Sequence, residues 1–147
     1  MRISTRGRYG LAALTLMALE PDISEAVTII SIANRLGISK IYLEQVFSLL
    51  KRAGIVTAIK GAQGGYRLNR APTSITALDI FAALEQSLFE QTDDSVRESD
   101  ESIELAMQSL VFTPLNEAVN SCLGTITLDA VAADVMRRKD GGTMFYI

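Results

Sequence analysis

Apolar residues recur at helical spacing between positions 39 and 54. Leu43, Val46, Phe47 and Leu50 fall at i, i+3, i+4 and i+7, so they form one stripe of a helix that faces a core. The opposite side carries an isoleucine, an acid, an amide and a serine, where an ordinary solvated helix carries repeated Glu and Lys. Side chains of these kinds are suited to reading the edges of DNA bases.

A second, shorter helix precedes this one. It is expected from Thr28 to Leu36 and is closed by Gly37, and Ser39 can then cap the longer helix. Two helices joined by a turn of about three residues form a helix–turn–helix. The pattern therefore predicts a unit that reads duplex DNA with a recognition helix beginning at Ser39.

The segments around this pair predict a winged helix. A β-rich run at 55–59 and another at 66–68 flank a glycine-rich tip, which predicts a hairpin. A helix from Ser4 or Thr5 to about Glu20 comes first, and a helix from Thr76 to about Gln86 follows a turn at 71–74. The expected fold class is mainly α with a small β-hairpin wing: a winged helix–turn–helix plus a long dimerisation helix.

A second apolar pattern follows an acidic segment, residues 90–102, which we expect to be an exposed linker or mobile loop. The step from Leu110 to Leu115 is five residues and contains Pro114, so a kink or a restart capped by Thr113 is expected there. A seam this narrow outside the first domain favours a partner helix over a private core, and hence a homodimer. The predicted dimerisation residues are Ile103, Met107, Leu110, Leu115, Val119, Cys122 and Ile126.

Beyond this seam, Thr127 can cap a short helix to about Met136, and Asp140–Gly142 is expected to release a tail. The chain is thus divided into a DNA-binding domain at 1–88, an acidic linker loop at 89–102, dimerisation helices at 103–136 and a C-terminal tail at 137–147.

The net charge of −3 hides an uneven distribution. Residues 1–70 hold ten Lys and Arg against four Asp and Glu, a net charge of +6, whereas residues 71–147 hold four against thirteen, a net charge of −9. A basic first half can neutralise DNA phosphates while an acidic second half is kept away from them. The alternative is uneven surface charge without a function.

Individual side chains of the recognition helix match base edges. Gln45 can pair with adenine, Glu44 can accept from the amine of cytosine, and Lys40 can bind guanine or a phosphate. Ile41 can pack on the methyl group of thymine. Tyr42 lies beside the apolar stripe and either touches a phosphate or braces the helix.

Two further segments are candidates for phosphate binding. The tip Lys60–Gly65 contains three glycines that permit positive φ and a close approach of the main chain, and in this position it is interpreted as a wing in or beside a minor groove rather than a plain turn. Three arginines near the start of the first helix suit a phosphate, unless they are an ordinary basic terminus. The predicted DNA-binding residues are Arg2, Thr5, Arg6, Arg8, Ser39, Lys40, Ile41, Tyr42, Glu44, Gln45, Ser48, Arg52, Lys60, Gly61, Ala62, Gln63, Gly64, Gly65 and Tyr66.

Several kinds of chemistry are not expected. The chain has no histidine, the commonest general base, and its one cysteine, Cys122, has no partner for a disulfide or a metal site. Cys122 is interpreted as a small residue of the dimer seam rather than a redox sensor. We therefore expect a cytoplasmic protein that is not an enzyme, with no cofactor, no metal and no membrane partner.

Four stretches carry a resemblance to a known family. Met1–Leu11, Ile38–Ser39 with Tyr42–Gln45, and Lys60–Tyr66 resemble the corresponding segments of the IscR, NsrR and CymR group of bacterial winged-helix regulators, and Ile126–Leu128, after the long helix, resembles part of the group's dimerisation arm. This resemblance implies a homodimer on a pseudo-palindromic operator, with two recognition helices in major grooves and two wings in minor grooves. Iron–sulfur members carry three cysteines before the long helix, where this chain has none.

Within the group, the chain is most similar to the CymR branch, which represses genes of cysteine and sulfur metabolism. Such repressors work with the cysteine synthase O-acetylserine thiol-lyase, an enzyme that recognises C-terminal isoleucines. The resemblance therefore implies that a tail ending in Tyr146 and Ile147 docks in that enzyme. The alternative is that the tail packs across its own dimer.

Other functions stay open at this point. The chain could be a cluster-free regulator of the same group with another regulon or a small-molecule signal. It could also be a protein-interaction adaptor that no longer reads DNA, although the polar and basic outer face of the Ser39 helix argues against this. The operator, the inducing signal and the choice between repression and activation are not readable from the sequence.

Overall fold

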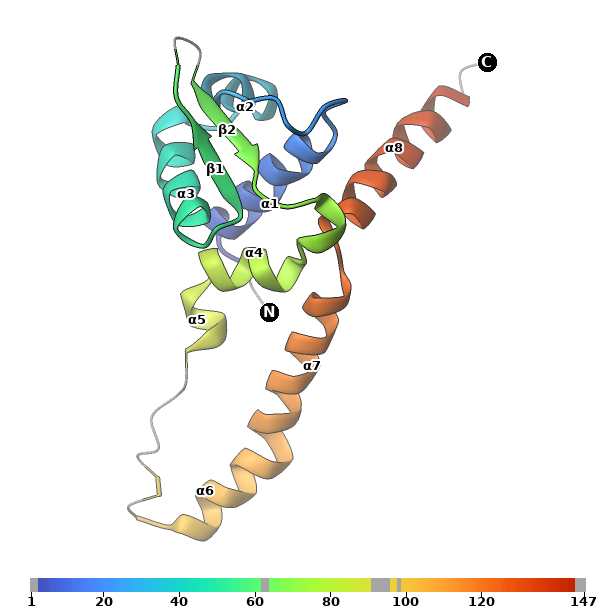
Figure 1. Ribbon diagram of the computed structural model, residues 1–147. Helices are drawn as coiled ribbons and strands as arrows, with labels where there is room; N and C mark the ends of the chain where they lie inside the picture. Colours follow the sequence, from blue (N-terminus) through green and yellow to red (C-terminus); the bar gives the residue numbers. More distant parts are fainter. Residues whose placement is uncertain (1–2, 62–63, 91–95, 98, 145–147) are drawn as a thin grey trace.

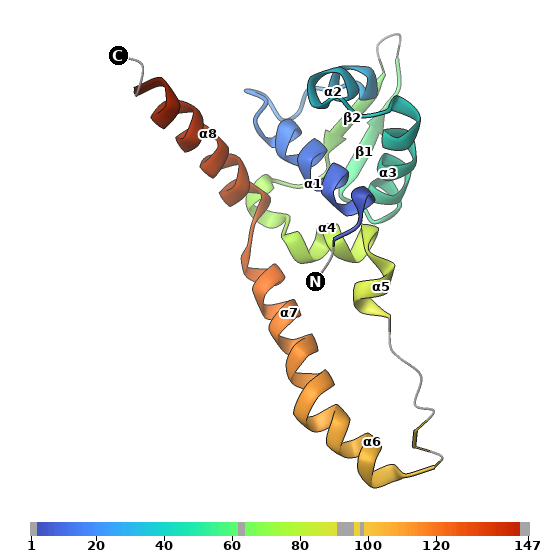
Figure 2. The same ribbon diagram turned by 180° about the vertical axis from the view of Figure 1, so that it is seen from behind.

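A group of helices with a hairpin on one side forms the first part of the chain, and two long helical segments extend from it (Figures 1 and 2). This computed structural model describes residues 3–144 except 62–63, 91–95 and 98. We call residues 3–89 the head and residues 101–144 the arm. The elements are α1 (Thr5–Ala18), α2 (Ile29–Leu36), α3 (Lys40–Arg52), β1 (Val56–Ile59), β2 (Gly65–Leu68), a 3-10 turn (Pro72–Ser74), α4 (Ala77–Leu84), α5 (Gln86–Phe89), α6 (Glu101–Met107), a π turn (Gln108–Phe112), α7 (Thr113–Thr125) and α8 (Leu128–Met144).

The first three helices begin where the sequence predicts. Ser4, Thr28 and Ser39 each precede a helix, and each side-chain oxygen accepts from the backbone N–H three residues later. Gly37 ends α2 at φ 66°, a left-handed conformation that glycine adopts without a steric penalty. These local signals fix the turn between α2 and α3, and with it the direction in which α3 leaves the core.

The core of the head collects buried side chains from α1, α2, α3 and α4. In α3, all four residues of the predicted stripe are fully buried. They pack with Leu14 of α1, Ile32 of α2 and Ile80 of α4, which are also fully buried. Burial of such side chains is worth about 1.5–3 kcal/mol each, so this cluster accounts for much of what holds α3 in place.

The hairpin forms an antiparallel pair in which Val56 lies opposite Leu68 and Ile59 lies opposite Gly65. It starts one residue later than predicted on the first strand and one earlier on the second. Val27, just before α2, adds a short third pairing, because its N–H and carbonyl both bond to Tyr66 at 2.8 and 2.9 Å. The wing is therefore attached to the helix–turn–helix as well as to its own loop.

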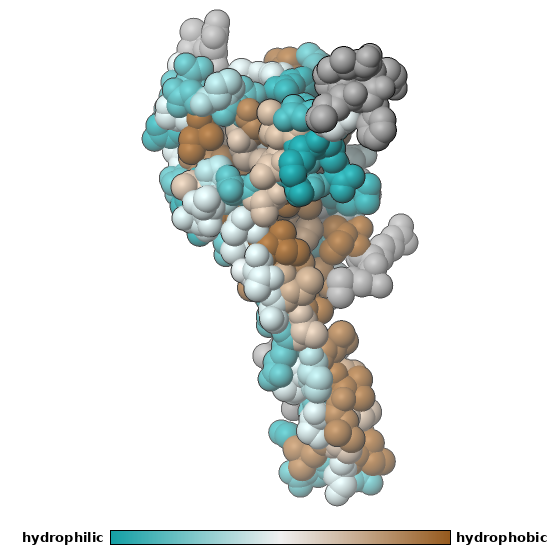
Figure 3. All heavy atoms as spheres, turned by 90° about the vertical axis from the view of Figure 1, so that its right-hand side faces the viewer, coloured by the Kyte–Doolittle hydropathy of each residue, from teal (hydrophilic) through white to brown (hydrophobic). Residues whose placement is uncertain are grey.

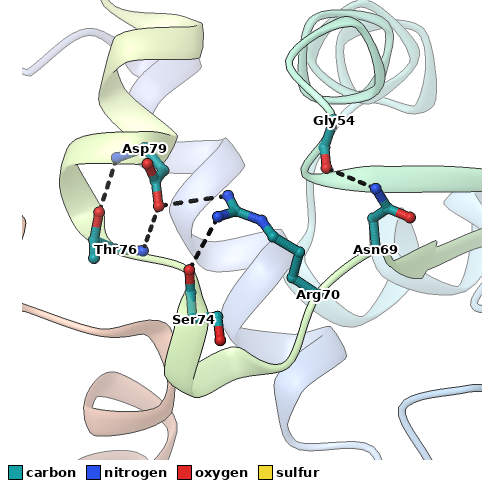
Figure 4. A network of polar contacts seen from close by, with 6 residues as sticks. All are labelled: Gly54, Asn69, Arg70, Ser74, Thr76 and Asp79. Atoms are coloured by element: carbon teal, nitrogen blue, oxygen red, sulfur yellow. Dashed lines mark hydrogen bonds and ion pairs between the residues drawn. The ribbon is translucent and has the colours of Figure 1, made fainter.

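Polar contacts join the base of the wing to the start of α4 (Figure 4). The guanidinium of Arg70 donates to the carbonyl of Ser74 at 3.1 Å and lies 3.4 Å from a carboxylate oxygen of Asp79. That carboxylate accepts the N–H of Thr76 at 3.0 Å, and the Thr76 hydroxyl accepts the N–H of Asp79, which makes a capping box. On the other side, the amide of Asn69 donates to the carbonyl of Gly54 at the end of α3.

α4 is shorter than predicted. It was expected to reach about Gln86, but it stops at Leu84, and Glu85 adopts φ −113° and ψ 81° before α5 begins. The side chain of Glu85 is buried and bonded to Ser4, a partner 81 residues away, so no local pattern indicated this break.

The arm corrects the prediction of a restart at Thr113. α6, the π turn and α7 follow one another without a break from Glu101 to Thr125, and Thr113 makes no side-chain cap. In an α-helix the ring of Pro114 would clash with the carbonyl four residues earlier. A wide π turn directly before it, in which the N–H of Thr113 donates to the carbonyl of Gln108, removes that conflict without ending the helix.

The arm is fixed to the head at the junction of α7 and α8. The N–H of Ala77 donates to the carbonyl of Ile126, and the N–H of Leu128 donates to the carbonyl of Ile75, both at 2.8 Å. The Thr127 hydroxyl accepts the N–H of Ala130, which confirms the predicted cap. Leu128 is buried, and α8 packs against α1 while α7 packs against α4.

α8 is longer than predicted. It continues past Met136 and through Gly141 and Gly142 to Met144, so the glycines do not release a tail at 140–142. The two glycines weaken a helix by roughly 1 kcal/mol each, yet α8 continues through both. None of the helices in the described ranges is both long and apolar enough to cross a membrane.

Candidate nucleic-acid interface

The outer face of α3 presents the predicted base-reading residues together. Ile41, Glu44, Gln45 and Ser48 are all exposed, and with Leu49 they line a shallow hollow of about 520 Å³. Their side chains point away from the buried stripe because the two sets lie on opposite sides of one helix. An exposed isoleucine among polar groups, 70% exposed here, is a side chain placed to contact a partner rather than to fill the core.

A cation and an acid share the first turns of this face. The ammonium of Lys40 lies 3.6 Å from a carboxylate oxygen of Glu44, four residues on, and both side chains are about half exposed. An exposed pair of this kind contributes little to stability, typically 0–1 kcal/mol. It does keep Lys40 beside the acid, so the negative charge of Glu44 is partly neutralised on the surface that would face DNA.

A second hollow lies between the helix–turn–helix and the wing. It measures about 340 Å³ and is lined by the start of α2, by Lys40 and by Gly64 to Tyr66 of the wing. Lys40 therefore borders both the base-reading face and the notch beside the wing. A cation in this position can bind a phosphate that lies between a major groove and the adjacent minor groove.

The wing positions a cation at its exposed end. Lys60 and Gly61 are exposed, and Gly61 has φ 147°, the only positive φ among the described glycines of the tip. Gly64 and Gly65 do not use the positive φ that glycine permits. Gly65 is needed for another reason, since a Cβ there would lie 2.5 Å from the Val27 carbonyl oxygen. Ala62 and Gln63 lie outside the described residues.

Two tyrosines near the interface have structural contacts. The ring of Tyr66 lies against that of buried Phe47, with centroids 4.9 Å apart. The ring of Tyr42 meets Tyr9 of α1 edge to face at 5.4 Å, which is the bracing contact that the sequence left open. Tyr42 is also half-buried, so α1 supports the first turn of the recognition helix.

The start of α1 is only partly free for phosphate. Thr5 and Arg8 are exposed, whereas Arg6 is half-buried and its Nε donates to the carbonyl of Leu84 at 2.9 Å. Arg2 lies outside the described residues. The N–H of Ser4 is taken by Glu85, a residue that the sequence did not single out, because it lies far along the chain in a segment with no motif.

The arm places the predicted dimerisation residues on its surface. Apolar side chains gather along one side of it (Figure 3). Leu110 is 78% exposed, Ile103, Leu115 and Ile126 are also exposed, and Met107 and Val119 are half-buried. Cys122 is exposed in the single chain, so it is no core residue of one chain. Tyr146 and Ile147 of the tail lie outside the described residues.

Comparison with known proteins identifies a family. Residues 3–134 match the Rrf2 family, described as "Iron-dependent Transcriptional regulator". The residues of this chain do not fit an iron–sulfur cluster held by cysteines, because Cys122 is the only cysteine and it lies on α7. In the described part of the chain, no three carboxylates or cysteines gather where they could hold a metal ion.

Named relatives cover most or all of the chain. The regulator CymR of Bacillus subtilis is 37% identical over 147 residues, which is the full length of both chains, and IscR of Xenorhabdus nematophila is 31% identical over 95% of this chain and 87% of its own.

Solved structures agree with these relatives. A structure of CymR from B. subtilis, titled the global cysteine regulator, covers 90% of this chain and 97% of its own, with a TM-score of 0.68 and 33% identity. A structure of T. potens IscR covers 92% of this chain and 88% of its own, with the same TM-score and 35% identity. The chain belongs to the Rrf2 family and is a winged helix–turn–helix transcriptional regulator of the CymR and IscR type.

Proposed function

We propose that this protein is a homodimeric repressor that binds a pseudo-palindromic operator through two recognition helices and two wings. The observation that carries the proposal is the outer face of α3. It exposes Ile41, Glu44, Gln45 and Ser48 side by side, with Lys40 at the edge of the same surface. An apolar side chain, an acid and an amide on one exposed face form a set that discriminates base pairs in the major groove.

The placement of charge supports the same orientation. The end of β1, the start of β2 and α2 lie at the end of the head opposite α4, and α6 and α7 lie beyond α4 (Figure 1). Residues 1–70 carry a net charge of +6, and the remainder, which includes the arm, carries −9. DNA bound at α3 and the wing would therefore meet the basic part of the molecule, while α6 and α7, which lie in the acidic part of the chain, extend away from that end of the head (Figure 1).

The exposed apolar side of the arm supports the homodimer. Leu110, Leu115 and Ile126 are exposed to water in the single chain. A partner arm could cover all three. An apolar seam of this length on a helix outside the head is stabilised when a second copy covers it. Two heads held by one pair of arms suit two half-sites related by a two-fold axis.

For the regulon, we propose genes of cysteine and sulfur metabolism. The support is the 37% identity over the full length of CymR, whose solved structure is titled a global cysteine regulator. A partnership with cysteine synthase through Tyr146 and Ile147 is part of this proposal. Deleting these two residues should abolish enzyme binding in calorimetry and leave DNA binding intact; unchanged enzyme binding would rule the docking out.

Base reading is tested by one pair of variants. Affinity of purified protein is measured for the DNA upstream of its own gene and for a random duplex of equal length. Gln45→Ala should lose about 1–3 kcal/mol on the specific duplex and little on the random one. The matched control is Gln86→Ala, an exposed glutamine on α5. Equal losses of affinity on both duplexes would contradict base reading by Gln45. Wild-type protein that binds neither duplex would favour a protein-interaction adaptor.

A further inference from the structure

Glu85 is a buried acid that the proposed interface does not use directly. It is 3% exposed and sits at the break between α4 and α5. One of its carboxylate oxygens accepts two hydrogen bonds from Ser4, from the backbone N–H at 2.8 Å and from the hydroxyl at 2.6 Å. Burying a carboxylate without hydrogen-bond donors is costly, so the two bonds from Ser4 make this a specific contact.

This contact completes the start of α1. The first turn of α1 contains no acidic residue, although an acid there is favoured by the helix dipole. Glu85 supplies that negative charge from another element, and the Ser4 hydroxyl that donates to it also accepts the N–H of Gly7 at 3.1 Å. A Cβ at Gly7 would lie 2.2 Å from the same carboxylate oxygen, so the helix start and the carboxylate are in direct contact.

A second bond fixes the same turn. Arg6 donates to the carbonyl of Leu84, the residue before Glu85, at 2.9 Å. The first turn of α1 is thus held at two points to the end of α4. Thr5 and Arg8, which lie on this turn, stay exposed.

The held turn also leads to the recognition helix. Tyr9 follows it directly and meets Tyr42 in the first turn of α3 at 5.4 Å. One residue further, a Cβ at Gly10 would lie 3.3 Å from Val46 of α3 and 2.2 Å from Leu84. α1 therefore fits tightly between the end of α4 and the recognition helix.

We propose that Glu85 is a positioning residue for DNA binding. It holds the start of α1 so that Thr5 and Arg8 face the phosphates, and so that Tyr9 supports Tyr42 at the start of α3. This inference rests on the proposed function, since it concerns the geometry with which the same surface meets DNA. Glu85 itself is too buried to touch DNA.

Replacing Glu85 by glutamine distinguishes a positioning role from a simple effect of charge, because the two predict opposite changes in DNA affinity. Glu85→Gln keeps the shape and one acceptor oxygen but turns charge-assisted bonds into neutral ones, which are about half as strong. Removing a negative charge alone should strengthen DNA binding or leave it unchanged. A positioning role should instead weaken it, and we expect a loss of about five- to tenfold.

The experiment is fluorescence anisotropy of the full-length protein with a random 30-base-pair duplex over a series of salt concentrations. For Glu85→Gln and for Ser4→Ala we expect weaker binding and a salt slope that is less steep by about one, because a phosphate contact is lost. The control is Glu90→Gln, an exposed acid five residues on. Circular dichroism and thermal melting establish that each variant is folded.

The outcomes separate the two proposals. Wild-type protein that does not bind DNA would overturn both. The positioning role alone would be overturned if the wild type binds DNA and both Glu85→Gln and Ser4→Ala have the same affinity and salt slope as the control Glu90→Gln. If one variant does not fold, the other decides the question, since Ser4→Ala removes the hydroxyl and leaves the buried carboxylate with the backbone N–H.

Discussion

Gly65 lies directly against the backbone of Val27: a Cβ on Gly65 would come within 2.5 Å of the Val27 carbonyl oxygen and 2.8 Å of its carbonyl carbon. The neighbouring residue Tyr66 pairs with Val27 through both backbone groups. This close approach is what seats the wing beside the helix–turn–helix, and backbone atoms cannot move aside as the end of a side chain can.

Gly65→Ala is therefore expected to destabilise the protein by about 1–3 kcal/mol, as overpacking does elsewhere. The matched control is Gly141→Ala, at a helical position with nothing within 4 Å of the added methyl group, which should stabilise by roughly 0.5–1 kcal/mol. Urea unfolding measures both. Loss of stability in both variants, or in neither, would contradict this view of the wing.

Ile41 is expected to read the methyl group of thymine. Replacing one dT of the operator by dU removes that methyl group and should cost about 0.8 kcal/mol, close to fourfold in affinity, at the position that Ile41 contacts. The test is a position-by-position exchange of dT for dU with wild-type protein and with Ile41→Ala. The variant should be indifferent to the exchange at that position. No sensitive position in the wild type would refute the contact.

Lys60 is expected to bind phosphate rather than a base. Lys60→Ala should weaken all duplexes alike and make the salt slope less steep by about one per subunit, because fewer counterions are released. Lys139→Ala on α8 serves as a control for the loss of one positive charge. A loss that depends on sequence would show that the wing reads bases.

We expect that the proposed dimer seam can be broken without touching the head. Leu110 is 78% exposed in the single chain, so Leu110→Asp should leave folding intact and convert the dimer to a monomer by placing charges opposite each other in an apolar seam. Ser109→Asp adds the same charge one residue earlier, at an exposed position outside the predicted seam. Light scattering after size exclusion measures the mass. A dimer that survives Leu110→Asp would place the interface elsewhere.

Stability should depend on pH through Asp79. Burial raises the pKa of this carboxyl, but the N–H and hydroxyl of Thr76 and the guanidinium of Arg70 outweigh burial, and the net effect lowers the pKa below its ordinary value of 3.8. A carboxyl whose pKa is lowered by folding stabilises the folded state above the unfolded pKa, and this contribution is lost as the pH falls through the folded value.

Asp79→Asn should consequently be less stable than the wild type at pH 7, with the difference shrinking as the pH falls below 3.8. Urea unfolding across this range measures the difference, and Asp140→Asn, an exposed acid on α8, is the control. A difference that stays constant with pH would mean that the negative charge of Asp79 is not what stabilises the capping box.

The start signals of the first three helices are local, which is why they could be predicted. Ser4, Thr28 and Ser39 each bond to a backbone N–H three residues on, so the information lies within one turn. The apolar stripe of α3 also follows from spacing alone, and spacing places Ile41 and Gln45 on the exposed side.

One feature that could not be predicted depends on residues far apart, and two others depend on how a helix accommodates residues that usually end it. Glu85 ends α4 because its side chain bonds to Ser4, a partner in another helix. α8 continues through Gly141 and Gly142, although two consecutive glycines are typical of the end of a helix. Pro114 is typical of a position where one helix ends and another begins, but the preceding π turn accommodates its ring. This proline therefore marks a distortion within the helix and not its end.

We propose that two copies of the head bind one duplex through α3 and the wing. The most direct measurement is hydroxyl-radical footprinting of purified full-length protein on the duplex that it selects from a random pool. We predict two protected half-sites of inverted sequence, with centres about 10 base pairs or a multiple of that apart. A single protected half-site bound by one chain, or no selected sequence at all, would contradict it.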